Sequence, residues 1–214
     1  MKRSKEADNK HFWKRWAGAY DRFMHSNERL YDQIACEIKK RLSRNMHVLE
    51  LACGTGLISY RIAGSVKSLE ATDFSPEMIA KAKEKACSYR LRFSVQDATN
   101  LPYADQTFDA VVIVNGLHIM PNPQLALREI RRVLKPSGVL IAPTFVHGEG
   151  AGLRLRARIL ELAGFHTYFQ WTADDLIAYV ASHHFTVNRH CLMGSSIAPL
   201  CYLEAQPGQG GRAA

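Results

Sequence analysis

The residues with the clearest chemical pattern are 48–56, which read Val-Leu-Glu-Leu-Ala-Cys-Gly-Thr-Gly. An apolar run carrying one carboxylate, Glu50, leads into a glycine loop, and a helical pattern begins at Leu57. A strand, a tight turn and a helix N-terminus in this order are how α/β proteins build a nucleotide site. The pattern therefore predicts a nucleotide-like ligand at the turn.

The charge of Glu50 selects among such ligands. A dinucleotide would place its pyrophosphate at this turn, and the nearby carboxylate would repel it. A ligand with a cationic end would be attracted, and S-adenosylmethionine (SAM) carries both a sulfonium and an ammonium group. An NAD-binding oxidoreductase is the weakest alternative, because Ser59 stands where its third glycine is expected.

Four further strand patterns follow the loop, and helical patterns separate them. They are residues 67–73, which end in an acid and lead into Phe-Ser-Pro-Glu-Met; residues 92–98, which end in Gln-Asp-Ala; residues 108–115; and residues 138–144. This alternation predicts a mainly parallel sheet with right-handed crossovers. Five ordered motifs of this kind resemble the class I SAM-dependent methyltransferases, and within them the small-molecule enzymes of ubiquinone and menaquinone biosynthesis.

The resemblance implies an α/β fold with a Rossmann-like, seven-stranded, mostly parallel sheet, helices on both faces and an antiparallel last strand. We expect helices at residues 28–42, 58–63, 76–87, 123–134, 153–163 and 172–182, and a closing antiparallel pair at 185–190 and 199–204. We expect a single methyltransferase domain over residues 1–205. Within it, residues 1–27 would form a helical lid and residues 145–171 an acceptor cap. The glycine-rich residues 206–214 are predicted to be a disordered tail.

The resemblance also implies which residues would hold SAM. Gly54 and Gly56 would let the backbone approach the methionine part, while Glu50 would hold its amino-acid end. Asp73 would accept the ribose hydroxyls, and Asp97 the adenine amino group. The full predicted set is Tyr20, Glu50, Ala52, Cys53, Gly54, Gly56, Asp73, Phe74, Met78, Asp97, Ala98 and Asn115. Ala52 stands where many relatives carry another glycine.

Several of these residues also have a purely structural interpretation. Phe74 and Met78 would sandwich the adenine, but Met78 could instead pack in the core. Tyr20 would close over the cofactor or pack in the core. Asp97 could cap its own loop, and Asp73 could serve only to open the turn that follows it.

On the acceptor side, His118 is the candidate general base, because an imidazole titrates near neutral pH. The alternative is a histidine that is hydrogen-bonded within its loop or packs near the cofactor. Residues 115–118 are not Asn-Pro-Pro-Tyr, which argues against methylation of amino groups on nucleic-acid bases or glutamine. Arg156 falls on the apolar face of the predicted helix 153–163, so it would bind an anionic acceptor, snorkel or form an internal salt bridge. Trp171 would line the acceptor pocket.

Composition sets the remaining limits. The chain has 214 residues, 47% of them hydrophobic, and a net charge of +8. Its five cysteines lack metal-ligand spacing, so no metal is expected. No apolar run is long enough to span a membrane, and a cytoplasmic location is expected.

Together, the motifs and the resemblance predict methyl transfer from SAM to a small or lipid-like acceptor by in-line displacement. A methyltransferase acting on RNA or protein, favoured only by the charge, and a non-catalytic SAM-binding module are the alternatives.

Overall fold

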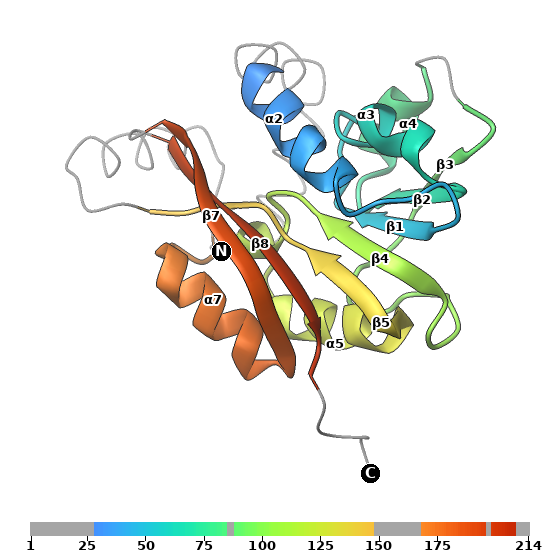
Figure 1. Cartoon of the computed structure of the whole chain (residues 1–214). Helices are drawn as coiled ribbons and strands as arrows, with labels where there is room; N and C mark the ends of the chain where they lie inside the picture. The colour runs from blue at the N-terminus through green and yellow to red at the C-terminus, as the bar shows by residue number, and fades with distance from the viewer. Residues whose placement is uncertain (1–27, 85–87, 148–167, 196–197, 209–214) are drawn as a thin grey trace, which may run out of the picture.

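A mixed sheet forms the centre of the computed structural model, which describes residues 28–84, 88–147, 168–195 and 198–208 (Figure 1). Its strand order is β3-β2-β1-β4-β5-β8-β6, with β7 paired to β8. The strands are β1 (His47–Leu51), β2 (Ser68–Asp73), β3 (Leu91–Val95), β4 (Phe108–Ile113), β5 (Leu134–Ile141), β6 (Thr144–Phe145), β7 (Phe185–Ser195) and β8 (Ala198–Pro207). β1 to β5 pair in parallel and β8 runs antiparallel to its neighbours, which confirms the predicted Rossmann-like fold.

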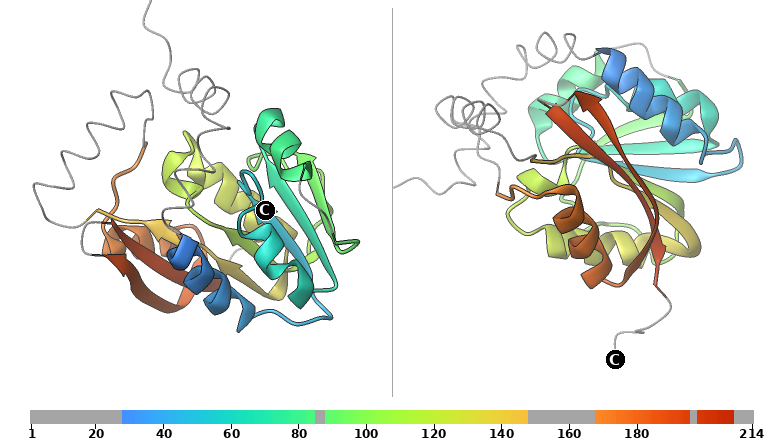
Figure 2. Two further views of the ribbon diagram at one scale, coloured as in Figure 1. Left: turned by 90° about the horizontal axis from the view of Figure 1, so that it is seen from above. Right: turned by 60° about the vertical axis from the view of Figure 1, so that its left-hand side comes forward.

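Helices cover both faces of this sheet, as predicted. α2 (Glu28–Lys39), α3 (Ser59–Ile62) and α4 (Pro76–Lys83) lie on one face, and α5 (Pro123–Val133) and α7 (Ala173–Ser182) lie on the other (Figures 1 and 2). Short 3-10 turns occur at η1 (Ala63–Ser65) and η2 (Leu117–Ile119). No helix among the described residues is both long and apolar enough to cross a membrane.

The alternation of side chains along the strands divides the apolar core into two layers. In β1, Val48 packs with α2 and α3, whereas Leu49 and Leu51 pack with α5 and α7. Successive side chains of a strand point to opposite faces, so one short strand serves both layers. The sheet is thereby buried on both faces, which leaves the ends of its strands as the places where polar chemistry can gather.

The fifth strand is interrupted, and this interruption accounts for the eighth strand. β5 ends at Ile141 and β6 begins at Thr144, yet both pair with β8 along one line. Pro143 lies between them and has no N–H to donate to a ladder. The predicted strand 138–144 is therefore two strands with a break at the proline, and β5 also begins earlier, at Leu134.

The last two strands are longer than predicted. They cover Phe185–Ser195 and Ala198–Pro207 rather than residues 185–190 and 199–204. The prediction of a disordered tail from residue 206 is wrong for its first residues, because Gln206 pairs with Thr186 and the Gly208 N–H donates to the His184 carbonyl at 2.8 Å. Residues 209–214 lie outside the described part of the chain.

Candidate active site

The loops that follow β1 and β3 are joined by hydrogen bonds to the carboxyl end of β2, which lies between them. The Cys53 N–H donates to the Thr72 carbonyl at 2.9 Å, and the Gln96 N–H donates to the Asp73 carbonyl at 3.1 Å. The Gly54 N–H donates to the Asp73 carboxylate at 2.8 Å. These bonds bring the predicted glycine loop, Asp73 and the loop that carries Asp97 to one edge of the sheet.

The glycine loop adopts the left-handed conformation at three positions, with φ of 53° at Ala52, 56° at Gly54 and 81° at Gly56. A Cβ on Gly56 would lie 2.8 Å from the Tyr60 ring and 2.9 Å from the Phe93 ring, so this position admits only glycine. Ala52 also adopts the left-handed conformation, which is unfavourable for a residue that carries a side chain. The absent side chain at Gly56 therefore makes room for the Tyr60 and Phe93 rings, and the close approach of a ligand to this loop stays a prediction.

Glu50 lies beneath this loop and is 2% exposed. Its carboxyl accepts a hydrogen bond from the Ser59 hydroxyl at 2.6 Å. Burial raises the pKa of Glu50 to about 8; the Ser59 bond lowers it and the nearby Asp73 charge raises it. A cation at this place would stabilise the ionised carboxylate. The bond from Ser59 to Glu50 was not foreseen from the sequence, where Ser59 counted only as an absent glycine.

Asp73 uses both carboxylate oxygens within the protein. Oδ2 accepts from the Gly54 N–H at 2.8 Å, and Oδ1 accepts from the Ser75 N–H at 2.9 Å. Burial raises the pKa of Asp73, and these N–H donors lower it. Asp73 therefore opens the turn before α4, yet an ionised carboxylate has further lone pairs that could accept hydroxyl groups. Its predicted ribose contact stays a prediction.

The residues predicted to surround adenine differ in their surroundings. Phe74 is 50% exposed, whereas Met78 is 2% exposed and its N–H donates to the Ser75 Oγ that caps α4. Asp97 accepts from both the N–H and the hydroxyl of Thr99 at 2.8 Å, so it caps its own loop. Ala98 packs beside the α5 and α7 core layer. Adenine binding by this set stays a prediction.

Asn115 fastens the end of β4 to its neighbours. Its φ is 55°, its N–H donates to the Pro143 carbonyl at 2.8 Å, and its Oδ1 accepts from the Phe145 N–H at 2.9 Å. Its Nδ2 donates to the hydroxyl of Tyr31 on α2 at 3.3 Å. Tyr31 was not singled out from the sequence, where it reads only as one residue of an amphipathic helix. The side chain of Asn115 therefore orients the loop that leads to His118.

His118 lies in η2 just after β4 and is 6% exposed. Burial, and to a lesser extent the charge of the nearby His147, lowers the pKa of His118 to about 4. His118 is therefore neutral at physiological pH. Trp171 is also buried, and the centre of its ring lies 4.8 Å from that of Phe169 and 4.7 Å from that of Tyr179. The roles predicted for these residues towards an acceptor stay predictions.

Two predicted site residues, Tyr20 and Arg156, lie outside the described residues. The same holds for the predicted lid at 1–27, the helix at 153–163 and most of the predicted acceptor cap at 145–171.

Comparison with known proteins agrees with this geometry. Residues 49–142, which run from β1 to the end of β5, match a family model described as a methyltransferase domain. Over these residues the chain resembles a methyltransferase domain. The match covers the glycine loop, Asp73, Asp97 and His118, so the resemblance predicted from the sequence is confirmed.

Curated relatives include a demethylmenaquinone methyltransferase of Leptospira interrogans, which is 37% identical over an alignment of 137 positions that covers 58% of this chain and 55% of that protein. A ubiquinone/menaquinone biosynthesis C-methyltransferase UbiE of Rickettsia massiliae is 36% identical over an alignment of 111 positions that covers 47% of this chain and 45% of that protein. The chain thus spans about half the length of the curated relatives it matches.

Solved structures show the same fold. A SAM-dependent methyltransferase from Thermotoga maritima superposes with a TM-score of 0.71 at 20% identity, over 92% of this chain and 98% of that one. The [4+2]-cyclase SpnF superposes with a TM-score of 0.69 at 24% identity, over 86% and 82%. One fold therefore carries different reactions, and the reaction has to be argued from the site.

Proposed function

We propose that the domain transfers a methyl group from SAM to a small or lipid-like acceptor by in-line displacement. The observation that carries this proposal is the buried carboxyl of Glu50 beneath a glycine loop that is itself bonded to Asp73. A carboxyl there disfavours a pyrophosphate and suits the ammonium end of SAM. The named activities of the relatives support the same reaction class.

The residues of the chain would bind and orient rather than react. Glu50 would hold the ammonium group, the backbone of the glycine loop would contact the methionine part, and Asp73 would accept the ribose hydroxyls. Bound SAM would supply an electrophilic methyl group and a thioether leaving group. Alignment of the acceptor in a dry site is then the main requirement, and His118 would remove a proton from an acceptor that carries one.

The acceptor is proposed to have an apolar body. His118 is surrounded by buried side chains, and the neighbouring residues 168–171 bring Phe169 and Trp171 to this side of the domain. The relatives' printed names point to isoprenoid quinones in those proteins. A quinone must be reduced to the quinol before its ring carbons become nucleophilic. The quinol form of an isoprenoid quinone is therefore the acceptor to test first.

Turnover separates this proposal from its alternatives. The purified chain would be mixed with SAM and a short-chain demethylmenaquinone reduced by dithionite, and release of S-adenosylhomocysteine would be measured. Transfer to RNA or to protein, assayed in parallel, would favour the alternative acceptors. SAM binding without any product from these acceptors would favour a binding module and contradict the proposed activity.

A further inference from the structure

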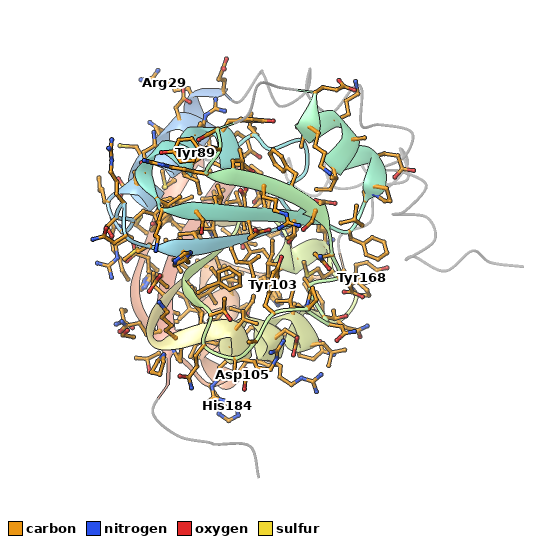
Figure 3. All side chains as sticks on the ribbon, turned by 90° about the vertical axis from the view of Figure 1, so that its right-hand side faces the viewer. Arg29, Tyr89, Tyr103, Asp105, Tyr168 and His184 are labelled. Atoms are coloured by element: carbon orange, nitrogen blue, oxygen red, sulfur yellow. The ribbon has the colours of Figure 1, made fainter. Side chains whose placement is uncertain are left out.

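A second histidine stands beside His118. His118 follows β4, His147 follows β6, and both main chains are bonded to one segment, residues 168–171. The His118 carbonyl accepts from the N–H groups of Tyr168 and Phe169 at 3.0 and 3.2 Å, and the His147 N–H donates to the Trp171 carbonyl at 2.7 Å. Figure 3 labels Tyr168 at the start of this segment. The two histidines therefore belong to one hydrogen-bonded unit next to the candidate active site.

Both imidazole rings carry a buried nitrogen that bonds to nothing among the described residues. This atom is Nδ1 in His118 and Nδ1 in His147. Buried polar atoms are nearly always paired, because an unpaired one loses its hydration without compensation. Two unpaired nitrogens on neighbouring histidines indicate a site where a ligand group or a proton could bind.

The two imidazole rings also interact electrostatically. Burial lowers the pKa of both histidines, and a charge on His147 lowers the pKa of His118 further. Tyr168 is the remaining titratable residue of this unit among the described residues; its side chain is partly exposed and its hydroxyl oxygen is buried. His147 is more exposed than His118, so it is the ring closer to solvent.

We propose that His147 is the relay partner of His118, and that the pair removes the proton of an acceptor bearing a hydroxyl group, such as a phenol or an enol. This inference rests on the methyl transfer proposed above. It assigns a role to His147, which the sequence gave no reason to single out, and it names the acceptor group that the unpaired nitrogens would bond.

The proposed step balances in charge and atoms. The acceptor O–H bond breaks and its proton forms an N–H bond on His118. The electron pair bonds to the methyl carbon as the C–S bond breaks, and it comes from the oxygen or, through a conjugated ring, from a carbon. A methylated ring carbon then loses its own proton and the oxygen regains one, which restores the aromatic ring without a change of net charge. One positive charge vanishes at sulfur and one appears on imidazole, so the buried site keeps its net charge. A deeply buried imidazole does not hold a proton at neutral pH, so the proton passes to His147 and then to solvent.

The pairing is tested first without any acceptor. Proton NMR would follow the imidazole Cε1–H signals of His118 and His147 against pH in the full chain. In the wild type, coupled rings should titrate in shared, two-step curves. In His147→Gln the midpoint of His118 should rise slightly, because burial still keeps it below its ordinary value, while His190→Gln, on the exposed face of β7, should leave it unchanged. Independent single-step curves in the wild type, or no change in His147→Gln, would overturn the pairing.

Single-turnover kinetics with the reduced short-chain demethylmenaquinone then test the relay. His118→Gln should slow methyl transfer by about 10²- to 10⁴-fold and His147→Gln by about 10-fold. The double variant should be no slower than His118→Gln, because the two residues act as a unit. Losses that multiply, or a His147→Gln rate equal to that of His190→Gln, would overturn the relay. If the wild type forms no product from this quinol, the proposed acceptor fails, and the titration alone decides the pairing.

Discussion

At the scale of single residues, Asp73 is the sharpest test of the cofactor assignment. Asp73→Ala should weaken SAM binding by about 1.5–3 kcal/mol, or roughly 10- to 150-fold, because charge-assisted hydrogen bonds to the ribose would be lost. Isothermal calorimetry would measure the affinity. Asp174→Ala, on the exposed first turn of α7, is the matched control and should bind normally. Unchanged affinity in a folded Asp73→Ala protein would remove Asp73 from the site.

Ala52 offers a test of backbone strain at the same loop. Its φ of 53° disfavours a side chain, and glycine adopts this conformation freely. Ala52→Gly should therefore raise the free energy of unfolding by up to about 1 kcal/mol, after the greater flexibility of glycine in the unfolded chain is subtracted. Urea unfolding would measure it. Ala80→Gly, at an exposed position of α4, should do the opposite and lose about 1 kcal/mol.

The titration of Glu50 predicts a pH dependence of stability. Burial raises its pKa from an ordinary 4.5 to about 8, so the folded state binds this proton more tightly than the unfolded state. Its contribution to stability is fully present below pH 4.5 and is lost as the pH rises through 8, with a slope of at most about 1.4 kcal/mol per pH unit. The difference between wild type and Glu50→Gln in urea unfolding isolates this contribution. A flat difference between pH 5 and 8 would contradict it.

At the scale of elements, Arg132 on α5 clamps the loop that carries Asp97. Its guanidinium donates to the Leu101 and Tyr103 carbonyls at 2.9 and 2.7 Å, and it pairs with Glu129 and Asp105. Figure 3 labels Tyr103 and Asp105 on this loop. The buried Glu129 also accepts from the Leu101 N–H. Residues of one helix, α5, thus hold this loop in place.

Arg132→Ala should lower the free energy of unfolding by about 2–3 kcal/mol, since it leaves a mostly buried carboxylate and two carbonyls without their donor. Arg128→Ala, exposed on the same helix, should change it by less than about 0.5 kcal/mol. Urea denaturation of both variants gives the comparison. Equal stabilities would mean that the clamp contributes nothing beyond a surface ion pair.

The elements also show what the sequence could predict. Strands such as β4, with its run of buried apolar residues, were placed correctly because burial on both faces leaves an unmistakable pattern. β7 was predicted too short because its second half is largely exposed, so no alternation of apolar and polar residues marks it. The break at Pro143 follows from its missing N–H, but only the pairing of both pieces with β8 reveals one interrupted strand.

At the scale of the whole molecule, topology predicted which loops meet, but not which side chains pair across them. The bond from Gly54 to Asp73 follows from adjacent parallel strands that end at one edge. The contact between Tyr31 and Asn115 joins positions 84 residues apart and depends on how α2 packs on the sheet. The proximity of His147 to His118 likewise depends on the segment that joins their backbones. Such contacts leave no periodic pattern in a single sequence.

Ligand-linked stability tests the choice of SAM over a dinucleotide for the whole domain. A ligand that binds only the folded state raises stability by about 2.7 kcal/mol at 100 times its Kd. For a chain of 214 residues this corresponds to a rise of roughly 5–10 °C in the Tm. SAM and S-adenosylhomocysteine should produce such a rise, and NAD at the same concentration should not, because an ionised Glu50 beside the turn would repel its pyrophosphate. Asp73→Ala should reduce the SAM-induced rise when that rise is measured from the variant's own ligand-free Tm, which falls because the Gly54 and Ser75 N–H groups lose their acceptor. An equal rise with NAD would show that the buried carboxyl does not set the choice of ligand.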